Sequence, residues 1–536
     1  MNSFTGIDIA VILLYFICVL GIGYWAFKRR KNETADYFLA GRDVGWLVVG
    51  ASLFASNIGS EHLVGLAGSG AAGGFAVGHF EWLACLILLL LGWMFVPFYL
   101  RSSVYTMPEF LEQRYSPASR WYLASISVVG YVLTKISVTL FAGGVVIREL
   151  TGLDMFQSAA ILVLITGLYT IAGGLRAVVY TELIQTFVLI FGSLTLVIIG
   201  LNEVGGWEGL RERMPADFFS MWKSSDHPDF PWTGIIFGAP ILGVWYWCTD
   251  QYIVQRVLAA RNIDEARTGT VFAGFLKILP VFIFVLPGVI AAALYADITG
   301  PSVDRAFPVL VTRLLPEGLK GLVFAGLLAA LMSSLSSVFN SCSTLITWDF
   351  YKKLKPDVDE RTLVIVGRVA TGALVVLGLL WIPFMKYIST QLYVYLQSVQ
   401  AYIAPPIAAC FLFGIFMPRL NGHGAIASLL SGFVLGALRL ILELVNGLEK
   451  TGLPSGTVWE WIAEINFLHF AVFLFIVCTA ILFGVSWATK APSPDQIKGL
   501  TFATVEKDKP GRRTQINKVL SFALVLTIVI LWIIFA

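Results

Sequence analysis

The chain has 536 residues, of which 57% are hydrophobic and only 13% are charged, about half the charged share of a soluble domain. This composition excludes a string of soluble domains and indicates a membrane protein. The 37 basic and 34 acidic side chains leave a net charge of +3, which is too balanced for a nucleic-acid-binding protein. The six cysteines lie in apolar stretches, so neither a disulfide framework nor a zinc site is expected.

Apolar runs of about 20 residues predict transmembrane helices, and fourteen such runs follow one another along the chain. They cover residues 7–27, 46–72, 80–100, 121–149, 157–173, 177–201, 233–257, 268–296, 320–348, 362–386, 392–417, 424–446, 463–487 and 517–536. The sequence therefore predicts an all-α polytopic membrane protein with about fourteen transmembrane helices.

Lysine and arginine collect in alternate loops of this arrangement, beginning with the cluster Lys28 to Lys31 after the first run. Basic loops stay on the cytoplasmic side of a membrane. We therefore predict a multi-pass protein of the plasma membrane with both termini outside the cell.

The second run is interrupted by polar residues, among them Asn57, Glu61 and His62, and glycines follow. Close helix packing by small residues is one alternative, but it explains the glycines and not the three polar side chains. A break in the helix explains both better, because backbone carbonyls freed by a break can bind a cation where they line a cavity.

The seventh run contains Trp245 to Gln251, a segment with three aromatic residues, an aspartate and a glutamine. At a membrane surface such aromatic residues would be ordinary anchors. A second helix break here, five helices after the first, would instead make two five-helix halves, and an odd number per half makes them inverted repeats. The expected segments are an extra N-terminal helix with a basic cytoplasmic loop (1–45), a first repeat with an external loop (46–232), a second repeat (233–420) and peripheral C-terminal helices (421–536).

Charged side chains lie deep in several apolar runs, and they are candidates for function because their burial in lipid is costly. Glu81 and Lys277 either pair with each other or both face a polar ligand. Lys135 either extends toward the membrane surface or contacts the ligand. Arg439 and Glu443 are four residues apart on one helix, so we expect them to pair.

The ninth run carries Ser333, Ser334, Ser336 and Ser337 in an otherwise apolar helix. Serine hydroxyls can bond back to the preceding helical turn. They can also add neutral oxygen ligands to the carbonyls of a broken helix, which suits a hard cation. Together with the break in the second run, the cation site is the better interpretation.

Gly68 to Gly73 matches the glycine pattern of a dinucleotide-binding loop, but no strand is predicted before it, so we reject a nucleotide site. No serine, histidine and carboxylate set comes together in one loop either. We therefore expect neither an enzyme nor a covalently bound cofactor.

Six separated motifs carry a resemblance to a known family. They occupy residues 51–60, 80–82, 134–137, 245–251, 274–280 and 331–334. The chain resembles the sodium/glucose cotransporters of the sodium:solute symporter family over nearly its whole length. The resemblance implies a LeuT-like, five-plus-five inverted-repeat core. It also implies a symporter that imports a glucose- or galactose-like hexose by alternating access, with Na⁺ as the coupling ion.

The resemblance further implies two sets of site residues. Backbone carbonyls and two hydroxyls would hold the sodium ion, from Ala55, Ile58, Ala330, Ser333 and Ser334. The sugar would be bound by Asn57, His62, Glu81, Lys277 and Gln397, with Tyr246 as an inner gate and Trp247 as an aromatic face.

Three positions depart from the family pattern. Glu182 replaces an aspartate, which bears on a second sodium site built from Glu182 and Ser337. Thr139 replaces an acidic residue found in many animal members, and Glu61 stands where sugar carriers commonly have glycine. The preferred sugar and the number of sodium ions are therefore not carried over.

Other functions stay open at this point. A sodium symporter with this sequence could instead carry an inositol, a carboxylate or an amino acid. A sugar-gated channel or a sensor would bind the solute without concentrating it. The expected partners are the sugar, Na⁺ and the lipid bilayer, without nucleic acid, and the sequence does not indicate an oligomeric state.

Overall fold

The structure is a computed structural model that describes residues 5–29, 34–59, 61–381, 392–446, 452–505 and 512–536. Within these ranges the chain is helical, and its β-bridges are isolated pairs of residues. Eleven helical stretches there are long and apolar enough to cross a membrane, and two shorter apolar helices add to them. The predicted all-α membrane protein is confirmed, whereas the count of fourteen spans stays a prediction.

The first part of the bundle contains the first broken span and a very long helix; η marks short π- or 3₁₀-helical segments. In chain order its elements are α1 (Gly6–Arg29), α2 (Thr34–Leu39), η1 (Ala40–Arg42), α3 (Trp46–Asn57), η2 (Glu61–Leu66), α4 (Ala67–Gly73), η3 (Gly74–Gly78), α5 (His79–Leu90), η4 (Leu91–Phe95), α6 (Val96–Arg101), α7 (Met107–Arg114), α8 (Pro117–Gly130), η5 (Tyr131–Ile136), α9 (Ser137–Thr151) and α10 (Met155–Val204).

The second part contains the second broken span and the serine-rich helix. Its elements are α11 (Gly206–Arg213), η6 (Ala216–Phe219), α12 (Trp232–Phe237), α13 (Ala239–Gly243), η7 (Val244–Thr249), α14 (Gln251–Leu258), α15 (Ile263–Leu276), η8 (Val281–Val285), α16 (Leu286–Leu294), η9 (Gly300–Arg305), α17 (Ala306–Leu314), α18 (Leu319–Leu345), η10 (Ile346–Tyr351) and α19 (Lys352–Leu354).

The last part is formed by long helices with two short ones between them. Its elements are α20 (Glu360–Trp381), α21 (Leu392–Phe416), α22 (Gly422–Asn446), α23 (Val458–Glu464), α24 (Phe467–Ala488), α25 (Pro494–Ile497) and α26 (Arg512–Ile534). The end of the span predicted over 362–386 lies outside the described residues.

Two predicted spans lie within one helical element, α10. The runs over 157–173 and 177–201 are its two halves, because residues 174–176, expected as a loop, continue the helix. Arg176 is the polar residue that suggested the loop, and its guanidinium pairs with Asp36 of α2 at 2.5 Å. The two halves of α10 pack against the same part of α18: Leu162 and Leu331 lie together beside Gly143, and Glu182 accepts a hydrogen bond from Ser333. A straight helix would separate Leu162 from Glu182 by about 30 Å, so α10 turns back on itself between these two residues.

Both predicted helix breaks are present. α3 ends at Asn57, and Ile58 has extended backbone with φ −76° and ψ 100°. The second break is at Asp250, between η7 and α14, with φ −75° and ψ 126°. Each break lies beside a π-helical segment, η2 or η7, and such segments are frequent at functional sites. The two breaks support the inverted-repeat organisation, which stays a prediction.

Close packing holds α3 in the interior of the bundle. α15 lies along it, and a Cβ on Gly50 would be 2.7 Å from the carbonyl oxygen of Gly269. α10 and α18 also pack against α3, and the Thr186 hydroxyl of α10 donates to Ala51 O at 3.1 Å. Small residues permit this approach of backbones in a membrane protein. The broken span therefore begins from a fixed helix.

Arg114 joins α7 to the end of α21. Its buried guanidinium donates to the carbonyls of Gly414, Met417 and Leu420 at 2.7, 2.9 and 2.9 Å. Gly414 lies in the last turn of α21, whereas Met417 and Leu420 follow the helix, so Arg114 binds carbonyl groups at the end of α21 and just after it. This side chain ties two distant parts of the sequence together.

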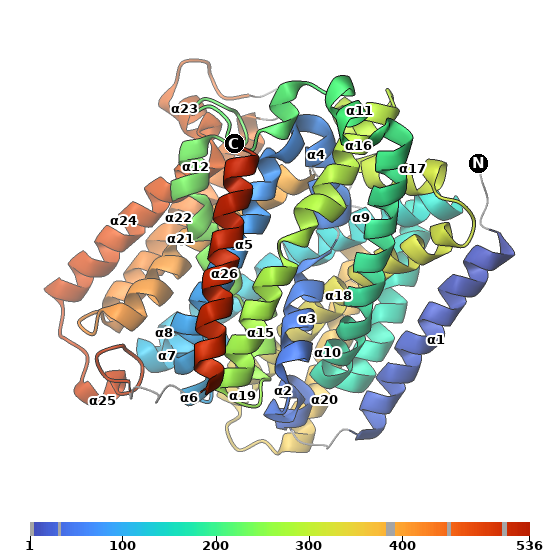
Figure 1. Cartoon of the computed structure of the whole chain (residues 1–536). Coiled ribbons are helices and arrows are strands. Elements are labelled where there is room, and N and C mark those ends of the chain that lie inside the picture. Colours follow the sequence, from blue (N-terminus) through green and yellow to red (C-terminus); the bar gives the residue numbers. More distant parts are fainter. Residues whose placement is uncertain (1–4, 30–33, 60, 382–391, 447–451, 506–511) are drawn as a thin grey trace.

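The two ends of the chain lie toward one end of the bundle, and several short helices lie at the opposite end. In Figure 1 the first turn of α1 and the last turn of α26 lie toward the upper end of the bundle, together with α11 and α23. The short helices α2, α6, α19 and α25 lie at the opposite end. The predicted alternation of loops is consistent with this arrangement, and the direction across the membrane stays a prediction.

Candidate functional site

A buried cavity of about 60 Å³ lies where the two broken spans meet. Its wall comes from η2, α5, η5, α13, η7 and α21, together with residues at the ends of α3 and α15. Its lining residues are Asn57, Glu61, His62, Phe80, Glu81, Leu83, Ala84, Lys135, Ala239, Leu242, Gly243, Tyr246, Trp247, Lys277, Tyr393, Leu396, Gln397 and Gln400. All seven predicted substrate residues are among them.

The helix breaks place polar side chains around this cavity. Asn57 is the last residue of α3, and His62 follows on η2 after the break. Tyr246 and Trp247 lie on η7, directly before the second break. Lys277 is the residue after α15, and Glu81 lies in the first turn of α5. Each of these side chains therefore comes from a helix end or a π-helical segment.

Lys277 is the centre of a hydrogen-bonded cluster. It forms an ion pair with Glu81, and its Nζ donates to Asn57 Oδ1 at 2.5 Å and lies 3.5 Å from His62 Nε2. The same His62 nitrogen lies 3.1 Å from Glu81 Oε1. A buried charge is costly unless it is paired, and both charges here are paired. Of the two alternatives for Glu81 and Lys277, the structure shows the ion pair, and both residues also line the cavity.

Two aromatic residues extend this cluster. Asn57 Nδ2 donates to the Tyr246 hydroxyl at 3.0 Å. The rings of Tyr246 and Trp247 meet edge to face with centroids 5.2 Å apart, and Lys277 Nζ lies 5.4 Å from the Trp247 ring centre. The cavity thus combines hydrogen-bonding groups with aromatic faces, as sites for ligands with both polar and apolar parts do.

Glu61 and Lys135 form a second ion pair in the cavity, 3.2 Å apart. Lys135 Nζ also lies 4.6 Å from the ring centre of Tyr246, within cation–π range. Of the two interpretations of Lys135, the structure supports contact with the cavity. Neither residue belongs to the substrate set that the family resemblance implies. Glu61 was noted only because sugar carriers of the family commonly have glycine at its position.

Residues of α21 complete the cavity. Gln397 was predicted, but Tyr393, Leu396 and Gln400 line it as well. Their spacing of three and four residues places them on one face of a helix. This periodicity is the signal from which the other three could have been found.

The expected sodium residues lie where the end of α3 meets α18. The hydroxyl of Ser334 donates to Ser56 O at 3.3 Å, and a Cβ on Gly59 would collide with that hydroxyl. Ala55, Ile58 and Ala330 are buried. Ser333, expected to face the same ion, instead donates to Glu182 Oε1 at 3.3 Å. The break and Ser334 are therefore neighbours, and the ligand set stays a prediction.

A separate polar cluster surrounds Glu182. The Ser56 and Ser337 hydroxyls donate to its carboxylate at 2.8 and 2.5 Å, and Ser52 bonds to it as well. Arg256 lies within the same cluster, 3.3 Å from Glu182, and also bonds to Ser337. The structure thus brings together Glu182 and Ser337, the two residues of the possible second sodium site. A permanent cation already lies beside both of them.

Arg439 and Glu443 form the expected pair on α22, at 3.9 Å. The Tyr402 hydroxyl also donates to Glu443 at 2.5 Å. Neither member lines the cavity, so this pair is a structural one.

Residues 37–432 match the sequence model of the sodium:solute symporter family. The chain belongs to this family. It is a sodium-coupled symporter with Na⁺ as its coupling ion, and its relatives are transporters rather than enzymes.

Curated relatives cover most of the chain. The sodium/myo-inositol cotransporter of Homo sapiens is 42% identical over 92% of this chain and 75% of its own length. Sodium/glucose cotransporter 1 of Oryctolagus cuniculus is 41% identical over 91% of this chain and 80% of its own length. The names of these two relatives give different solutes, so similarity alone does not choose between them.

Solved structures share the fold. A Na⁺-coupled sialic acid symporter in a substrate-bound, outward-open state gives a TM-score of 0.78 at 21% identity, covering 92% of this chain and all of that one. The nucleobase-cation-symport-1 family transporter Mhp1 gives a TM-score of 0.55 at 14% identity, covering 86% of this chain and 96% of its own. At these identities the likeness concerns the arrangement of helices.

Proposed function

We propose that the symporter imports a neutral, polyhydroxylated ring solute, a hexose or a cyclic polyol, driven by sodium. The observation that carries this proposal is the charge balance of the cavity. Among its described lining residues are two carboxylates and two lysines, and each carboxylate pairs with one lysine. Paired charges offer donors and acceptors to hydroxyl groups without favouring an anion or a cation.

The aromatic faces agree with a sugar or cyclic polyol. Such a ring has polar hydroxyls around its edge and apolar C–H groups on its faces. Trp247 and Tyr246 can pack against these faces while Asn57, Gln397 and the charged groups bind the edge. The names of the inositol and glucose cotransporters among the relatives fit this class.

A carboxylate or an amino acid is the less favoured substrate. A carboxylate requires a surplus of positive charge or free backbone donors, whereas Lys277 and Lys135 are already paired with Glu81 and Glu61. An amino acid would require a second, acidic place for its ammonium group. The charge-balanced cavity offers neither a surplus of positive charge nor a separate acidic group.

The proposed mechanism is alternating access coupled to sodium. A sodium ion bound by the carbonyls of Ala55, Ile58 and Ala330 and the hydroxyls of Ser333 and Ser334 would join the end of α3 to α18. That junction fixes the segment that carries Asn57 and His62, so sodium raises the affinity for the solute. Linkage requires the solute to raise the affinity for sodium by the same factor. Tyr246 then gates the inner side, and rocking of one repeat against the other opens it.

Reconstituted transport tests this proposal. The full chain in sealed proteoliposomes, with an imposed sodium gradient and voltage, should concentrate labelled glucose, galactose or myo-inositol above the outside level. Lactate and proline should enter at the rate of protein-free vesicles. Uphill uptake also excludes the channel and sensor alternatives, because neither can concentrate a solute. Sodium-driven uptake of lactate or proline, without uptake of any polyol, would overturn the proposal.

A further inference from the structure

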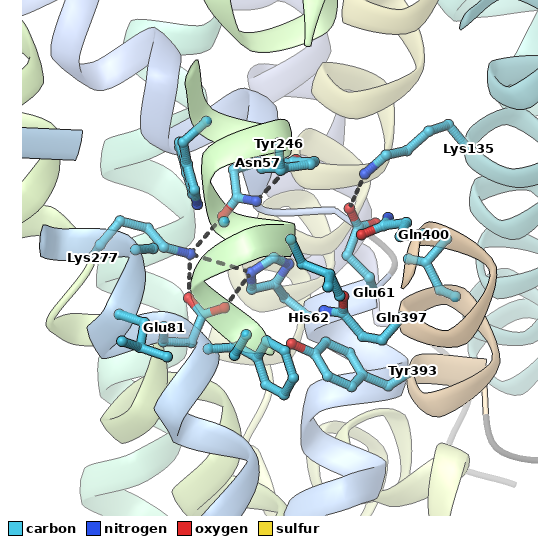
Figure 2. Close-up of a pocket in the computed structure, with 18 residues that line it drawn as sticks. Asn57, Glu61, His62, Glu81, Lys135, Tyr246, Lys277, Tyr393, Gln397 and Gln400 are labelled. Carbon is cyan, nitrogen blue, oxygen red and sulfur yellow. Dashed lines mark hydrogen bonds and ion pairs between the residues drawn. The ribbon is translucent and has the colours of Figure 1, made fainter. Parts of the chain in front are cut away.

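The ion pair between Glu61 and Lys135 gives the cavity a second charged end. In Figure 2, Lys277 and Glu81 lie on one side of Asn57 and His62, and Glu61 and Lys135 lie on the other. All four charged residues are at least 95% buried. The site expected from the family resemblance contains the first end alone.

Tyr246 lies between the two ends. Its hydroxyl accepts a hydrogen bond from Asn57, which is bonded to Lys277. Its ring faces Lys135, which is bonded to Glu61. A ring solute placed against Tyr246 therefore has one charged pair within reach of each edge.

Stability alone is a weak reason to keep a second buried ion pair. Burying two charges costs desolvation energy that their attraction often fails to recover, and an apolar pair of similar volume is frequently as stable. Glu61 and Lys135 are 74 residues apart in sequence and come from different elements, η2 and η5. An ion pair that is buried at this desolvation cost inside a ligand cavity indicates a role in binding the ligand.

Resting on the proposed function, we infer that Glu61 and Lys135 form a second hydroxyl-binding subsite that selects a cyclic polyol over a pyranose sugar. A carboxylate only accepts hydrogen bonds and an ammonium group only donates them. A hydroxyl group satisfies both, because it donates to Glu61 and accepts from Lys135. The ring oxygen of a pyranose only accepts, so at this place it can bond to Lys135 but adds no hydrogen bond to Glu61 beyond those that Glu61 already has.

The two ends together explain why the whole ring matters. A cyclic polyol with a hydroxyl on every ring carbon presents a donor and acceptor to Glu81 and Lys277 and another to Glu61 and Lys135. A hexose has an ether oxygen and an exocyclic carbon at one edge. Sites built to bond a hydroxyl discriminate strongly against analogues that lack it, so we expect a preference of at least about tenfold for the polyol.

The test compares two solutes in variants of the full chain in proteoliposomes. Wild type should transport myo-inositol with a kcat/KM at least about tenfold above that for glucose. Glu61→Gln should lower this ratio by about tenfold or more, with the sodium concentration for half-maximal uptake unchanged within about twofold. The double variant Glu61→Gln with Lys135→Gln should lower the ratio equally and leaves no unpaired buried lysine. These shifts follow from losing one substrate hydrogen bond to a charged group.

A matched control breaks an ion pair outside the cavity. Glu443→Gln on α22 removes the partner of Arg439, which lies 3.9 Å away, and should leave the solute ratio as in wild type. A second measurement needs no variant. Cyclic polyols that lack one hydroxyl should compete with labelled myo-inositol on wild type, and at least one of them should be about tenfold weaker than myo-inositol itself.

The outcomes separate this inference from the proposed function. If wild type transports neither solute with sodium, the proposed function fails. If it transports glucose at least as well as myo-inositol, or if the Glu61 variants keep the wild-type ratio, the inference fails and the proposed function stands. A change confined to sodium dependence also overturns it, and so does equal competition by every deoxygenated polyol.

Discussion

Single residues show where side-chain identity predicts a role and where it does not. Ser333 and Ser334 are adjacent in the sequence, but their hydroxyls bond to different partners, Glu182 and the Ser56 carbonyl. Neighbouring side chains on an α-helix point about 100° apart, and the sequence alone does not tell which partner each one meets. Ser334 is therefore the residue on which the sodium site is best tested.

Ser334→Ala should weaken sodium binding. Removing a hydroxyl ligand from a cation site leaves one fewer oxygen for the ion, and a loss of about 1.4 kcal/mol is a tenfold change in affinity. We expect the sodium concentration for half-maximal uptake to rise by about tenfold or more. Sodium titration of solute uptake measures this.

The matched control is Ser336→Ala on the same helix. The Ser336 hydroxyl donates to Ser333 O within α18, at 2.9 Å, so its loss should not alter sodium dependence. An unchanged sodium titration in Ser334→Ala would remove this residue from the sodium site.

At the scale of elements, the sequence predicted the places where helices are interrupted better than the places where they end. Polar residues in an apolar run indicated the breaks at Ile58 and Asp250, and both are present. The helical backbone of residues 174–176, which were expected as a loop, was missed, because a hydropathy pattern does not contain the pairing of Arg176 with Asp36. Hydropathy does not predict contacts between residues that are far apart in the sequence.

The same reason applies to the site. The seven substrate residues implied by the family resemblance all line the cavity, and their role in binding stays a prediction. Glu61 and Lys135 were missed as a pair because their contact depends on how η2 lies against η5. No local pattern in either segment specifies that packing.

Gly59→Ala should disable the junction between α3 and α18. A Cβ at this position would collide with the Ser334 hydroxyl and lie 2.9 Å from Glu61 Oε2, so the backbone after the break would have to move away. We expect sodium-driven uptake to fall by about tenfold or more, since misplacement of about 1 Å at a functional site can have effects of that size. Uptake at saturating sodium and thermal unfolding in detergent are the measurements.

Gly372→Ala on α20 is the control, because a Cβ there has no neighbour within 4 Å. It should keep both uptake and the unfolding temperature. Full sodium-dependent uptake by Gly59→Ala would show that this contact does not position the junction.

At the scale of the molecule, transport is an exchange of energy between two gradients. One charge moved through 100 mV supplies about 2.3 kcal/mol, and a tenfold sodium gradient supplies about 1.4 kcal/mol. One sodium ion per cycle can therefore support a solute gradient of several hundred-fold. Two ions would square that limit.

We predict one net charge per solute molecule. Glu182 and Ser337 are the residues of a possible second sodium site, but Arg256 lies 3.3 Å from that carboxylate and bonds to Ser337. A cation beside the site lowers its attraction for another cation. Charge movement measured together with labelled solute uptake gives the ratio directly, and a ratio of two would restore the second sodium site.

The hydrogen bonds of Arg114 limit which parts can travel separately during such a cycle. This one side chain holds α7 to three carbonyls at the end of α21 and just after it, and α21 also carries Gln397 and Gln400 into the cavity. Any displacement of that helix must bring α7 with it or break several bonds to a buried guanidinium at once. The flexible joints of the cycle are then to be sought at Ile58 and Asp250, where the backbone already leaves the helix.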